Sequence, residues 1–422
     1  MKKQQILYLC HRIPYPPNKG DKIRSYNQVR FLSEHADVDL VTLADDPGDF
    51  AHESVLAQMC RRVKVFSLNR HLAKIRGMWE LAAGRSISQG YFYHPGFQQT
   101  VDAWVSSSPY DAIVCFSSPM AGYLLKGMPE YQKDSQDRNR QPAQFVMDFC
   151  DLDSDKWRQY ARQASFPMNL VYNAEGKRLL AFEKKIARAF DHSVFVSRAE
   201  ADLFIKAFPG AGQVGVIPNG VDFDSFSPDR VMPVETTGAP MMMFPGAMDY
   251  HANVEGVCWF VREIFPQVLQ QVPDAVFYIV GSNPVQKVRD LEKTPGVIVT
   301  GFVADIRQYY RAADLCVIPL TIARGVQNKV LEAMAMEKPV VSTSVAVQGI
   351  SASHGRDLVV ADAPGQFARD TVRLLQDRDL ADAYGLAARR FVRNHHDWDQ
   401  ILKMFYATLF MTGEGSTDEI HL

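Results

Sequence analysis

The stretch Pro319–Thr343 holds polar groups whose types and spacing suit the binding of a phosphorylated ligand. Its sequence predicts a strand, a glycine-containing loop, a helix, and a second strand opened by Pro339. The loop leads into the N-terminus of the helix, where backbone N–H groups and the helix dipole favour an anion such as a diphosphate. Glu332 lies further along that helix, and its carboxylate could accept both hydroxyls of a ribose. The alternative is a surface glutamate on an amphipathic helix.

Two cations flank the same loop. Arg324 precedes the predicted helix, and Lys329 lies in its first turn. An arginine can bind two phosphate oxygens at once, whereas a lysine acts as a point charge. The two residues would add positive charge where the helix N-terminus already favours an anion. The alternative is that both are solvated charges of the loop and helix.

Four aspartates crowd the end of another predicted strand: Asp148, Asp151, Asp153 and Asp155. Carboxylates at this spacing invite a metal site, because hard divalent cations prefer oxygen ligands. Asp153 and Ser154 also suit the N-terminal cap of a helix that begins near Asp155. The residue types alone leave both interpretations open.

The turn after the first predicted strand contains Gly20 among charged residues. A glycine here allows a tight turn. Lys19, Lys22 and Arg24 lie next to it and could contact a phosphate. The alternative is that these three charges form the solvated start of a helix.

The segment Arg61–Arg85 is strongly basic. It carries seven lysines and arginines against one acid, Glu80, so its net charge is 7 − 1 = +6. Apolar residues recur beside these charges at helical spacing; they are Leu72, Ile75, Met78, Trp79 and Ala82. A basic amphipathic helix with a tryptophan suits an anionic membrane surface. The alternative is an apolar stripe that faces the core, with a solvated basic face.

Short apolar runs alternate with longer amphipathic segments through most of the chain, which predicts βαβ units and parallel sheets. Predicted strands in the first half are 5–10, 38–43, 63–68, 112–116, 145–149 and 193–196. Those in the second half are 241–244, 276–280, 297–300, 315–319, 340–343 and 358–361. Long helices are predicted over 155–190 and 254–272. The fold class is therefore α/β, with two doubly wound domains whose ligands gather at the carboxyl ends of the strands.

Glycine and proline residues near 210–222 mark the boundary between the two domains. We predict a first domain at residues 1–212 and a second at 213–396. A terminal helix at 397–412 is expected to pack back on the first domain. The tail at 413–422 lacks apolar periodicity and is expected to be disordered.

Composition excludes several classes of protein. The 422 residues include 46 Lys and Arg against 48 Asp and Glu, a formal charge of −2, which excludes nucleic-acid binding through bulk charge. Hydrophobic residues make up 47%, which excludes wholesale disorder. The six cysteines lack the close spacing of a zinc or redox motif and suit buried thiols in a reducing cytosol. No apolar run approaches the roughly 18 residues of a membrane span, so we expect a cytoplasmic protein that contacts a membrane only at its surface, if at all.

Several motifs resemble glycosyltransferase family 4. They are Ile-Pro-Asn-Gly-Val-Asp at 217–222, Phe-Pro-Gly-Ala-Met at 244–248, and Leu-Glu-Ala-Met-Ala at 331–335, followed by Pro-Val-Val at 339–341. The resemblance covers nearly the whole chain and implies the GT-B fold, in which two Rossmann-like domains face each other across a cleft that holds the nucleotide sugar. Residues 11–25 and 148–157 further resemble the sugar transferases associated with PEP-CTERM/exosortase exopolysaccharide systems.

The resemblance implies roles for individual residues. Donor-binding residues are expected at Gly20, Gly246, Gly281, Val303, Arg324, Gly325, Asn328, Lys329 and Glu332. Acceptor contacts are expected at Lys19, Asp21, Arg24 and Asp148, and catalytic residues at Asp148, Asp151, Arg324 and Lys329. The sequence departs from the family in three places. Arg324 replaces the first of two glutamates, and Ala247 and Ala252 occupy the positions where family members customarily carry the cations that bind the diphosphate.

The implied function is a retaining glycosyltransferase that moves a sugar from a nucleotide-diphosphate sugar to a saccharide acceptor, expected to be lipid-linked, in exopolysaccharide biosynthesis. The resemblance implies front-face displacement with no enzyme nucleophile, no cofactor and no bound metal. We expect a cytoplasmic enzyme that contacts the inner face of the membrane through Asn69–Gly84 and binds no nucleic acid. Two alternatives stay open: a UDP-sugar 2-epimerase of the same fold, and a non-catalytic protein that binds nucleotide sugars.

Overall fold

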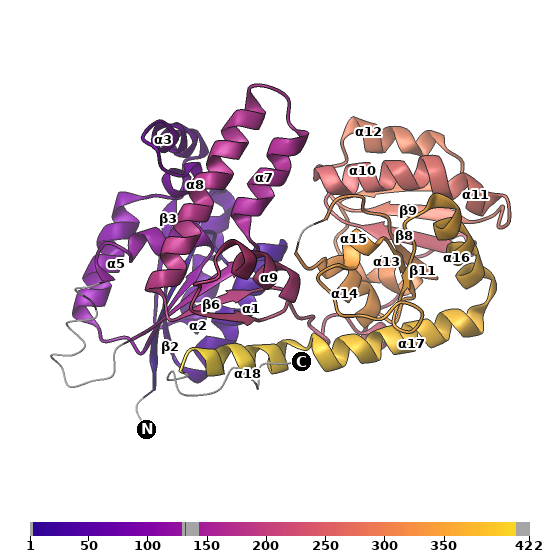
Figure 1. The fold of residues 1–422 in the computed structure, drawn as a ribbon. Helices are drawn as coiled ribbons and strands as arrows, with labels where there is room; N and C mark the ends of the chain where they lie inside the picture. The colour runs from indigo at the N-terminus through magenta and orange to yellow at the C-terminus, as the bar shows by residue number, and fades with distance from the viewer. Residues whose placement is uncertain (1–2, 129–130, 132–142, 324, 411–422) are drawn as a thin grey trace. The chain divides into compact units, whose positions relative to one another are not determined.

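The computed structural model describes residues 3–128, 131, 143–323 and 325–410, and the chain divides into two compact units (Figure 1). One unit runs to Pro218 and takes up the chain again at Asp399, and the other comprises Asn219–Trp398. The boundary predicted after residue 212 is too early. The reason is that β7 (Gln213–Val216) still pairs with β6 (His192–Phe195) in the sheet of the first unit.

The first unit is built on a seven-stranded parallel sheet in the order β3-β2-β1-β4-β5-β6-β7. Its other strands are β1 (Gln5–Cys10), β2 (Asp37–Ala44), β3 (Arg62–Ser67), β4 (Ala112–Phe116) and β5 (Gln144–Cys150). The central strands are buried along almost their whole length. Helices on both faces of a parallel sheet impose this burial, which explains the unbroken apolar runs of the sequence.

Helices cover this sheet, and two of them correct a prediction. The helices of the first unit are α1 (Gly20–His35), α2 (Glu53–Met59), α3 (Arg70–Ala82), α4 (Ile87–Tyr91), α5 (Pro95–Ser107), α7 (Asp153–Gln163), α8 (Met168–Ala189) and α9 (Arg198–Ala207). The single helix predicted over 155–190 is wrong, because α7 ends at Gln163 and α8 begins only after Pro167, its N-cap residue. Proline disfavours helical backbone in the residue before it and lacks the N–H that a helix interior needs.

The second unit has a six-stranded sheet in the order β10-β9-β8-β11-β12-β13, with parallel pairing. Its strands are β8 (Met241–Pro245), β9 (Val276–Val280), β10 (Val297–Gly301), β11 (Leu315–Ile318), β12 (Val340–Ser342) and β13 (Val359–Val360). Its helices are α10 (His251–Trp259), α11 (Phe265–Leu269), α12 (Gln286–Arg289), α13 (Arg307–Ala312), α14 (Asn328–Ala335), α15 (Ser344–Val347), α16 (Pro364–Gln376) and α17 (Arg378–His395). The helix predicted over 254–272 is interrupted by a π-helical turn at Phe260–Ile264.

The helix α18 (Trp398–Thr408) starts at the last residue of the second unit and otherwise belongs to the first. Tyr406 of this helix donates a hydrogen bond to Gln4 Oε1 at 2.6 Å. Its ring also lies 6.3 Å from that of Phe31 on α1. The chain therefore supplies one side of the first unit from its far end. The tail predicted at 413–422 lies outside the described residues.

The helix α3 exposes the apolar residues of the basic segment. Leu72, Ile75, Met78 and Trp79 are 58%, 66%, 53% and 73% exposed. The face that packs inward instead carries Ala73 and Gly77. The alternative of an apolar stripe facing the core is therefore wrong. Among the described residues, no helix combines the length and the apolar character needed to cross a membrane.

A buried ion pair joins the sheet of the first unit to α1. Arg24 Nε donates to Asp148 Oδ2 at 2.9 Å, and the two side chains are 1% and 0% exposed. Gln28, one turn further along α1, donates to the same oxygen at 2.6 Å and accepts from the Tyr8 hydroxyl of β1. Arg24 Nη1 also donates to the carbonyl of Ile217, close to the end of the unit. Segments distant in sequence therefore meet around the Arg24–Asp148 pair: β1, α1, β5 and the end of the unit.

We predict that Asp148→Ala destabilises the chain by about 3–5 kcal/mol, because it leaves the Arg24 guanidinium buried without its carboxylate. Denaturant unfolding measures this change. Asp224→Ala is the control: it removes a carboxylate that is 85% exposed, and the free energy of unfolding should change by less than about 0.5 kcal/mol. A variant that unfolds like the parent and loses only activity would return Asp148 to the group of substrate-contacting residues.

Candidate active site

Two glycine turns meet at the carboxyl ends of β8 and β9. The backbone φ angles of Gly246 and Gly281 are +155° and +151°, which L-residues with a side chain rarely adopt. A Cβ on Gly281 would lie 1.8 Å from the carbonyl oxygen of Gly246. Gly246 N also donates to the carbonyl of Val280 at 2.9 Å. The sequence therefore needs glycine at both positions to bring the two turns together.

The ammonium of Lys329 lies against the first of these turns. Lys329 extends from the first turn of α14, and its Nζ donates to Asn253 Oδ1 at 2.6 Å. The same Nζ lies 4.2 Å from the centre of the Phe244 ring and would be 3.1 Å from a Cβ on Gly246. Burial lowers the pKa of Lys329 to about 7, although Glu332 opposes that shift. This lysine therefore changes charge close to neutral pH.

Glu332 is the second polar group of α14. The buried Tyr310 hydroxyl donates to its Oε2 at 3.1 Å and lies 3.3 Å from the carbonyl oxygen of Lys329. Burial raises the pKa of Glu332, against the effects of Tyr310 and Lys329. At the start of α14, Asn328 Oδ1 accepts a hydrogen bond from Asn219 at 3.0 Å. The structure thus brings Asn328, Lys329 and Glu332 together on one helix.

Sequence reasoning missed Asn253, which organises this arrangement. Asn253 is 5% exposed, and its amide nitrogen donates to the carbonyl of Ala247 at 2.9 Å while its oxygen accepts from Lys329. It therefore fixes both the turn after β8 and the lysine. A polar residue beside Ala252 and Val254 at the start of an apolar helix was the available signal.

The other residues predicted in the second unit fall in loops around α14 and β10. Gly325 has a φ of +58°, and a Cβ on Gly349 would lie 2.9 Å from its carbonyl oxygen. Val303 follows β10 and packs, partly buried, against the core. Arg324 lies outside the described residues.

In the first unit, Asp21 is paired with Arg12 and lies close to His11. Arg12 donates to its Oδ2 at 2.8 Å, and His11 Nε2 lies 3.4 Å from the same oxygen. Burial alone would raise the pKa of Asp21, but His11 and Arg12 hold it well below its usual range. Lys19 and Gly20 are exposed at the start of α1. Asp21 is therefore an ionised carboxylate beside a glycine turn.

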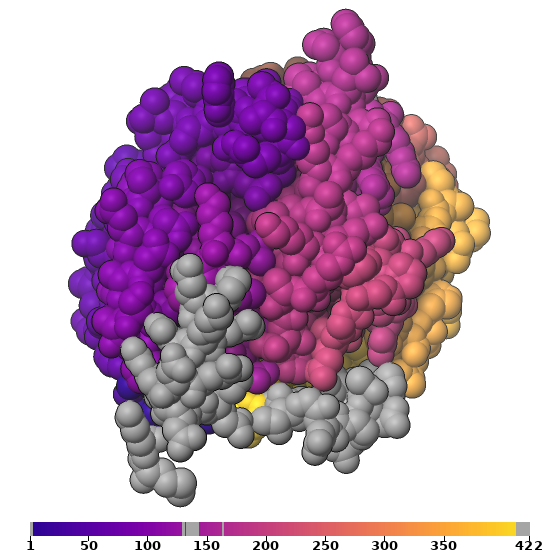
Figure 2. All heavy atoms as spheres, turned by 60° about the vertical axis from the view of Figure 1, so that its left-hand side comes forward, coloured from indigo at the N-terminus to yellow at the C-terminus, as the bar shows by residue number. Residues whose placement is uncertain are grey.

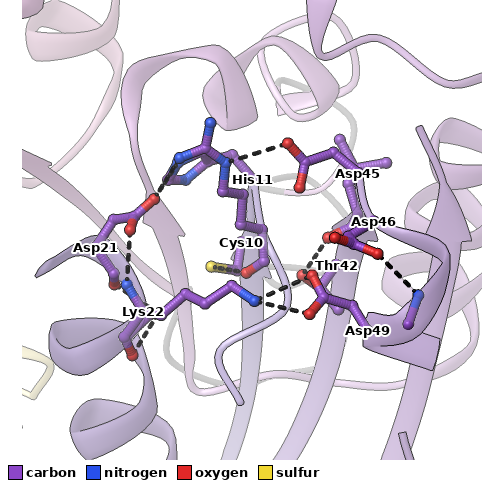
Figure 3. Close-up of polar contacts among 12 residues, drawn as sticks. Cys10, His11, Asp21, Lys22, Thr42, Asp45, Asp46 and Asp49 are labelled. Carbon is purple, nitrogen blue, oxygen red and sulfur yellow. Dashed lines mark hydrogen bonds and ion pairs between the residues drawn. The ribbon is translucent and has the colours of Figure 1, made fainter. Parts of the chain in front are cut away.

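Lys22 and Arg24 were predicted to contact a phosphate or an acceptor, but both form ion pairs inside the first unit. Lys22 is 5% exposed, and its Nζ lies 3.0 Å from both carboxylate oxygens of Asp49 (Figure 3). Arg24 is buried against Asp148, as described above. We therefore correct the prediction that Arg24 and Asp148 contact an acceptor, because neither side chain reaches the surface of the unit. Lys19 remains the exposed cation of this turn.

The aspartates after β5 differ in exposure. Asp148 is buried, whereas Asp151 is half-buried. Burial, with Asp151 nearby, raises the pKa of Glu200 to about 7. The helix α7 starts at Asp153, two residues before the start predicted near Asp155. Within the part of the chain that the structure describes, no three His, Cys, Asp or Glu side chains gather as they would around a metal ion.

Two Rossmann-like units with parallel sheets define the GT-B class of fold, and solved structures share it. Sucrose-phosphate synthase from Thermosynechococcus elongatus has a TM-score of 0.68 at 19% identity, over 97% of this chain and 99% of that one. HepE of Anabaena, solved in complex with UDP and glucose, has a TM-score of 0.62 at 16% identity, over 96% and 99%.

Sequence comparisons place a glycosyltransferase domain in each half of the chain. The model described as "Glycosyl transferase 4-like domain" matches residues 24–220, and "Glycosyl transferases group 1" matches 239–377. The chain is a glycosyltransferase of the group 1 and 4-like type, within EC 2.4.

Curated relatives are distant. An uncharacterised 44.6 kDa protein in the cps region of Klebsiella pneumoniae is 21% identical over 95% of this chain and 99% of its own length. A GDP-mannose-dependent alpha-(1-6)-phosphatidylinositol monomannoside mannosyltransferase of Mycobacterium tuberculosis is 27% identical over 52% of this chain and 61% of its own. Identity at this level leaves donor and acceptor to be argued from the residues.

We predict that the stability of the parent rises relative to Lys329→Met between about pH 7 and pH 10. The pKa of Lys329 is lowered in the folded chain, so above pH 7 the unfolded chain binds the extra proton. The difference should grow by up to about 1.4 kcal/mol per pH unit in this range and level off below pH 7. Denaturant unfolding of both proteins at several pH values measures it. A difference that does not change with pH would contradict the lowered pKa of Lys329.

Proposed function

We propose that the chain transfers a sugar from a nucleotide-diphosphate sugar to a saccharide acceptor, and that its second unit binds the donor. The place of Lys329 carries this proposal. The ammonium comes from α14 yet lies at the turn after β8, 3.1 Å from where a Cβ on Gly246 would be. Family members carry their diphosphate cations after this strand, where the chain has Ala247 and Ala252. Lys329 thus supplies positive charge to the place from which the usual cations are missing.

The neighbouring groups suit the rest of a donor. The N-terminus of α14 adds about half a positive charge for the diphosphate. Glu332, oriented by the Tyr310 hydroxyl, is proposed to accept the ribose hydroxyls. Arg324 is proposed as a second diphosphate cation. A relative that is GDP-mannose-dependent and a neighbour solved with UDP and glucose support a nucleotide-diphosphate donor.

The proposed reaction retains the anomeric configuration by front-face displacement. The leaving phosphate oxygen takes the proton of the acceptor hydroxyl, so the chain needs no nucleophile. As the bond to the sugar breaks, charge grows on the diphosphate, and fixed cations stabilise that charge more than they stabilise the bound donor. A diphosphate next to Lys329 would favour its protonated form. Binding of the donor would therefore complete the charge of its own site, without a metal.

For the acceptor we propose Asp21, Lys19 and Asp151 of the first unit. Asp21 is ionised, and an ionised carboxylate can accept hydrogen bonds from sugar hydroxyls. We propose a lipid-linked acceptor and a role in exopolysaccharide biosynthesis of the PEP-CTERM/exosortase type. The cps-region relative and the phosphatidylinositol mannoside named for the mycobacterial relative support a polysaccharide role and a lipid-linked acceptor, respectively.

Two other functions of the same fold make different products. A UDP-sugar 2-epimerase would convert the donor sugar without an acceptor, and a binding protein would leave the donor intact. Release of nucleoside diphosphate that depends on a saccharide acceptor separates the transferase from both. A panel of nucleotide sugars, screened by thermal stabilisation, identifies the donor first, because a ligand that binds only the folded chain raises its melting temperature.

We predict that Lys329→Ala lowers turnover at saturating donor by about 100-fold, by analogy with removed oxyanion donors. Arg324→Ala should have a similar effect. Arg324→Glu should be worse than alanine, although it restores the customary family residue, because Ala247 and Ala252 supply no compensating cations. Release of nucleoside diphosphate from the donor measures turnover.

Lys206→Ala is the control for these variants, because Lys206 is an exposed lysine of α9. It should turn over like the parent. Full activity of Lys329→Ala would end the proposal that this lysine serves the diphosphate.

We also predict that the rate of nucleoside diphosphate release is unchanged by a chelator. A loss of rate that magnesium or manganese restores would end the proposal of a metal-free reaction.

We also propose that the chain works at the inner, cytoplasmic face of a membrane and contacts it through Asn69–Gly84. Ion pairs offset part of the +6 charge around this segment: Asp39 pairs with Arg61 and Arg62, and Asp45 with Arg70. Lys74 remains exposed and Arg76 half-exposed on α3. An anionic surface within a Debye length would attract these charges.

We predict that replacing Arg70, Lys74 and Arg76 with Glu releases the chain from vesicles that contain phosphatidylglycerol. The control changes the net charge equally but on the second unit, by replacing the exposed Arg373, Arg378 and Arg390 with Glu. Co-sedimentation with vesicles measures both. Equal binding of parent and α3 variant would contradict the proposed contact.

A further inference from the structure

A second exposed apolar element lies in the first unit besides α3. It is the α7–α8 tip, residues 164–170, which comprises the connection between the two helices and the first turn of α8. Phe166, Met168 and Leu170 of this tip are 77%, 43% and 58% exposed. Behind this tip, the rings of Trp157 and Tyr172 pack against each other at 5.3 Å. A group of large side chains at this exposure, on a rigid base of two helices, is unusual for a surface that meets only water.

The two exposed elements are connected by hydrogen bonds from α8 to the helices α3 and α4. Glu175 of α8 is fully buried and accepts hydrogen bonds from Ser86 Oγ and from the backbone N–H groups of Ile87 and Ser88 at the start of α4. Arg178, one turn further along α8, donates to the carbonyl of Leu81 at the end of α3. The pair α3 and α4 is therefore fastened to α8 by charged side chains.

The helices α3 and α4 themselves pack closely. A Cβ on Gly77 of α3 would lie 2.8 Å from the side chain of Ile87, and one on Gly90 of α4 would lie 2.8 Å from the carbonyl oxygen of Arg76. Glycine at both positions lets the helices touch, so the small residues face inward and the large apolar residues of α3 face out. Figures 1 and 2 both place α3 and the α7–α8 tip at the same end of the unit.

The two helices that carry the tip are also basic. The segment from Asp153 to Ala189 has eight lysines and arginines against four acids, a net of 8 − 4 = +4. Two of those acids, Glu175 and Glu183, are fully buried. The solvent around α7 and α8 therefore meets mainly positive charge.

We infer that α3 and the α7–α8 tip insert together into an anionic lipid surface, with Phe166 and Leu170 as the second point of insertion. Figure 2 shows the tip as a protrusion, a shape that can enter a deformable lipid surface. Basic side chains beside apolar ones match the two components of binding to an anionic bilayer, headgroup attraction and burial of apolar area. The inference rests on the proposed membrane contact of α3 and is independent of the sugar transferred.

The test is the double variant Phe166→Ser/Leu170→Ser, measured by co-sedimentation of the full chain with phosphatidylglycerol-containing vesicles. Burial of two large apolar side chains contributes enough that their loss should weaken partitioning by about tenfold or more. Met232→Ser, which removes an apolar side chain that is 80% exposed on the second unit, should bind like the parent. Because these side chains are exposed, the variants should melt like the parent.

A second readout does not depend on folding of the double variant. Ser165→Cys, labelled with an environment-sensitive dye, should shift its emission to the blue with anionic vesicles and not with phosphatidylcholine alone. Binding that is unchanged in the double variant but lost on charge reversal of α3 overturns the inference and leaves the α3 contact standing. Failure of the parent to bind vesicles, or self-association through the tip in its place, overturns both.

Discussion

The architecture of the first unit depends on a charge that has no access to water. Asp148 lies within an apolar strand, so its carboxylate needs a full complement of donors, and Arg24, Gln28 and its own turn supply them. This requirement fixes the rotation of α1 on the sheet, which in turn places Asp21 and the Gly20 turn at the carboxyl ends of the strands. The proposed acceptor carboxylate is thus positioned by a neighbour that does not touch substrate.

In the second unit, the proposed function requires a cation at the turn after β8, where the chain has Ala247 and Ala252. The electrostatic stabilisation of the proposed diphosphate depends on where the positive charge lies and not on which element carries the residue. Lys329 reaches the turn after β8 because Gly246 leaves room there and Asn253 holds its ammonium. Burial lowers the pKa of this lysine and so disfavours its charged form, and a neighbouring anion would favour that form.

The sequence predicts the two parallel sheets well, because strands buried on both faces are continuous apolar runs. It fails where the outcome depends on partners far along the chain. By sequence Asp148 stands close to the end of a predicted strand, and only its ion pair with Arg24, 124 residues away, shows that its side chain is internal. The apolar residues of α3 have the spacing of a stripe that faces the core. The close contact of Gly77 with Ile87 instead turns the small residues inward and the large apolar residues outward. Likewise, β7 is a short edge strand with little apolar pattern.

The return of α18 to the first unit has a consequence for synthesis on the ribosome. The second unit, Asn219–Trp398, is inserted in the chain between the first unit and its last helix. At about 5–20 residues per second, its 398 − 218 = 180 residues take about 10 to 40 s to make. During that interval Phe31 and Gln4 lack their contacts with Tyr406, so the nascent first unit has an uncovered face. Chaperone binding to ribosome-bound chains would concentrate in that interval.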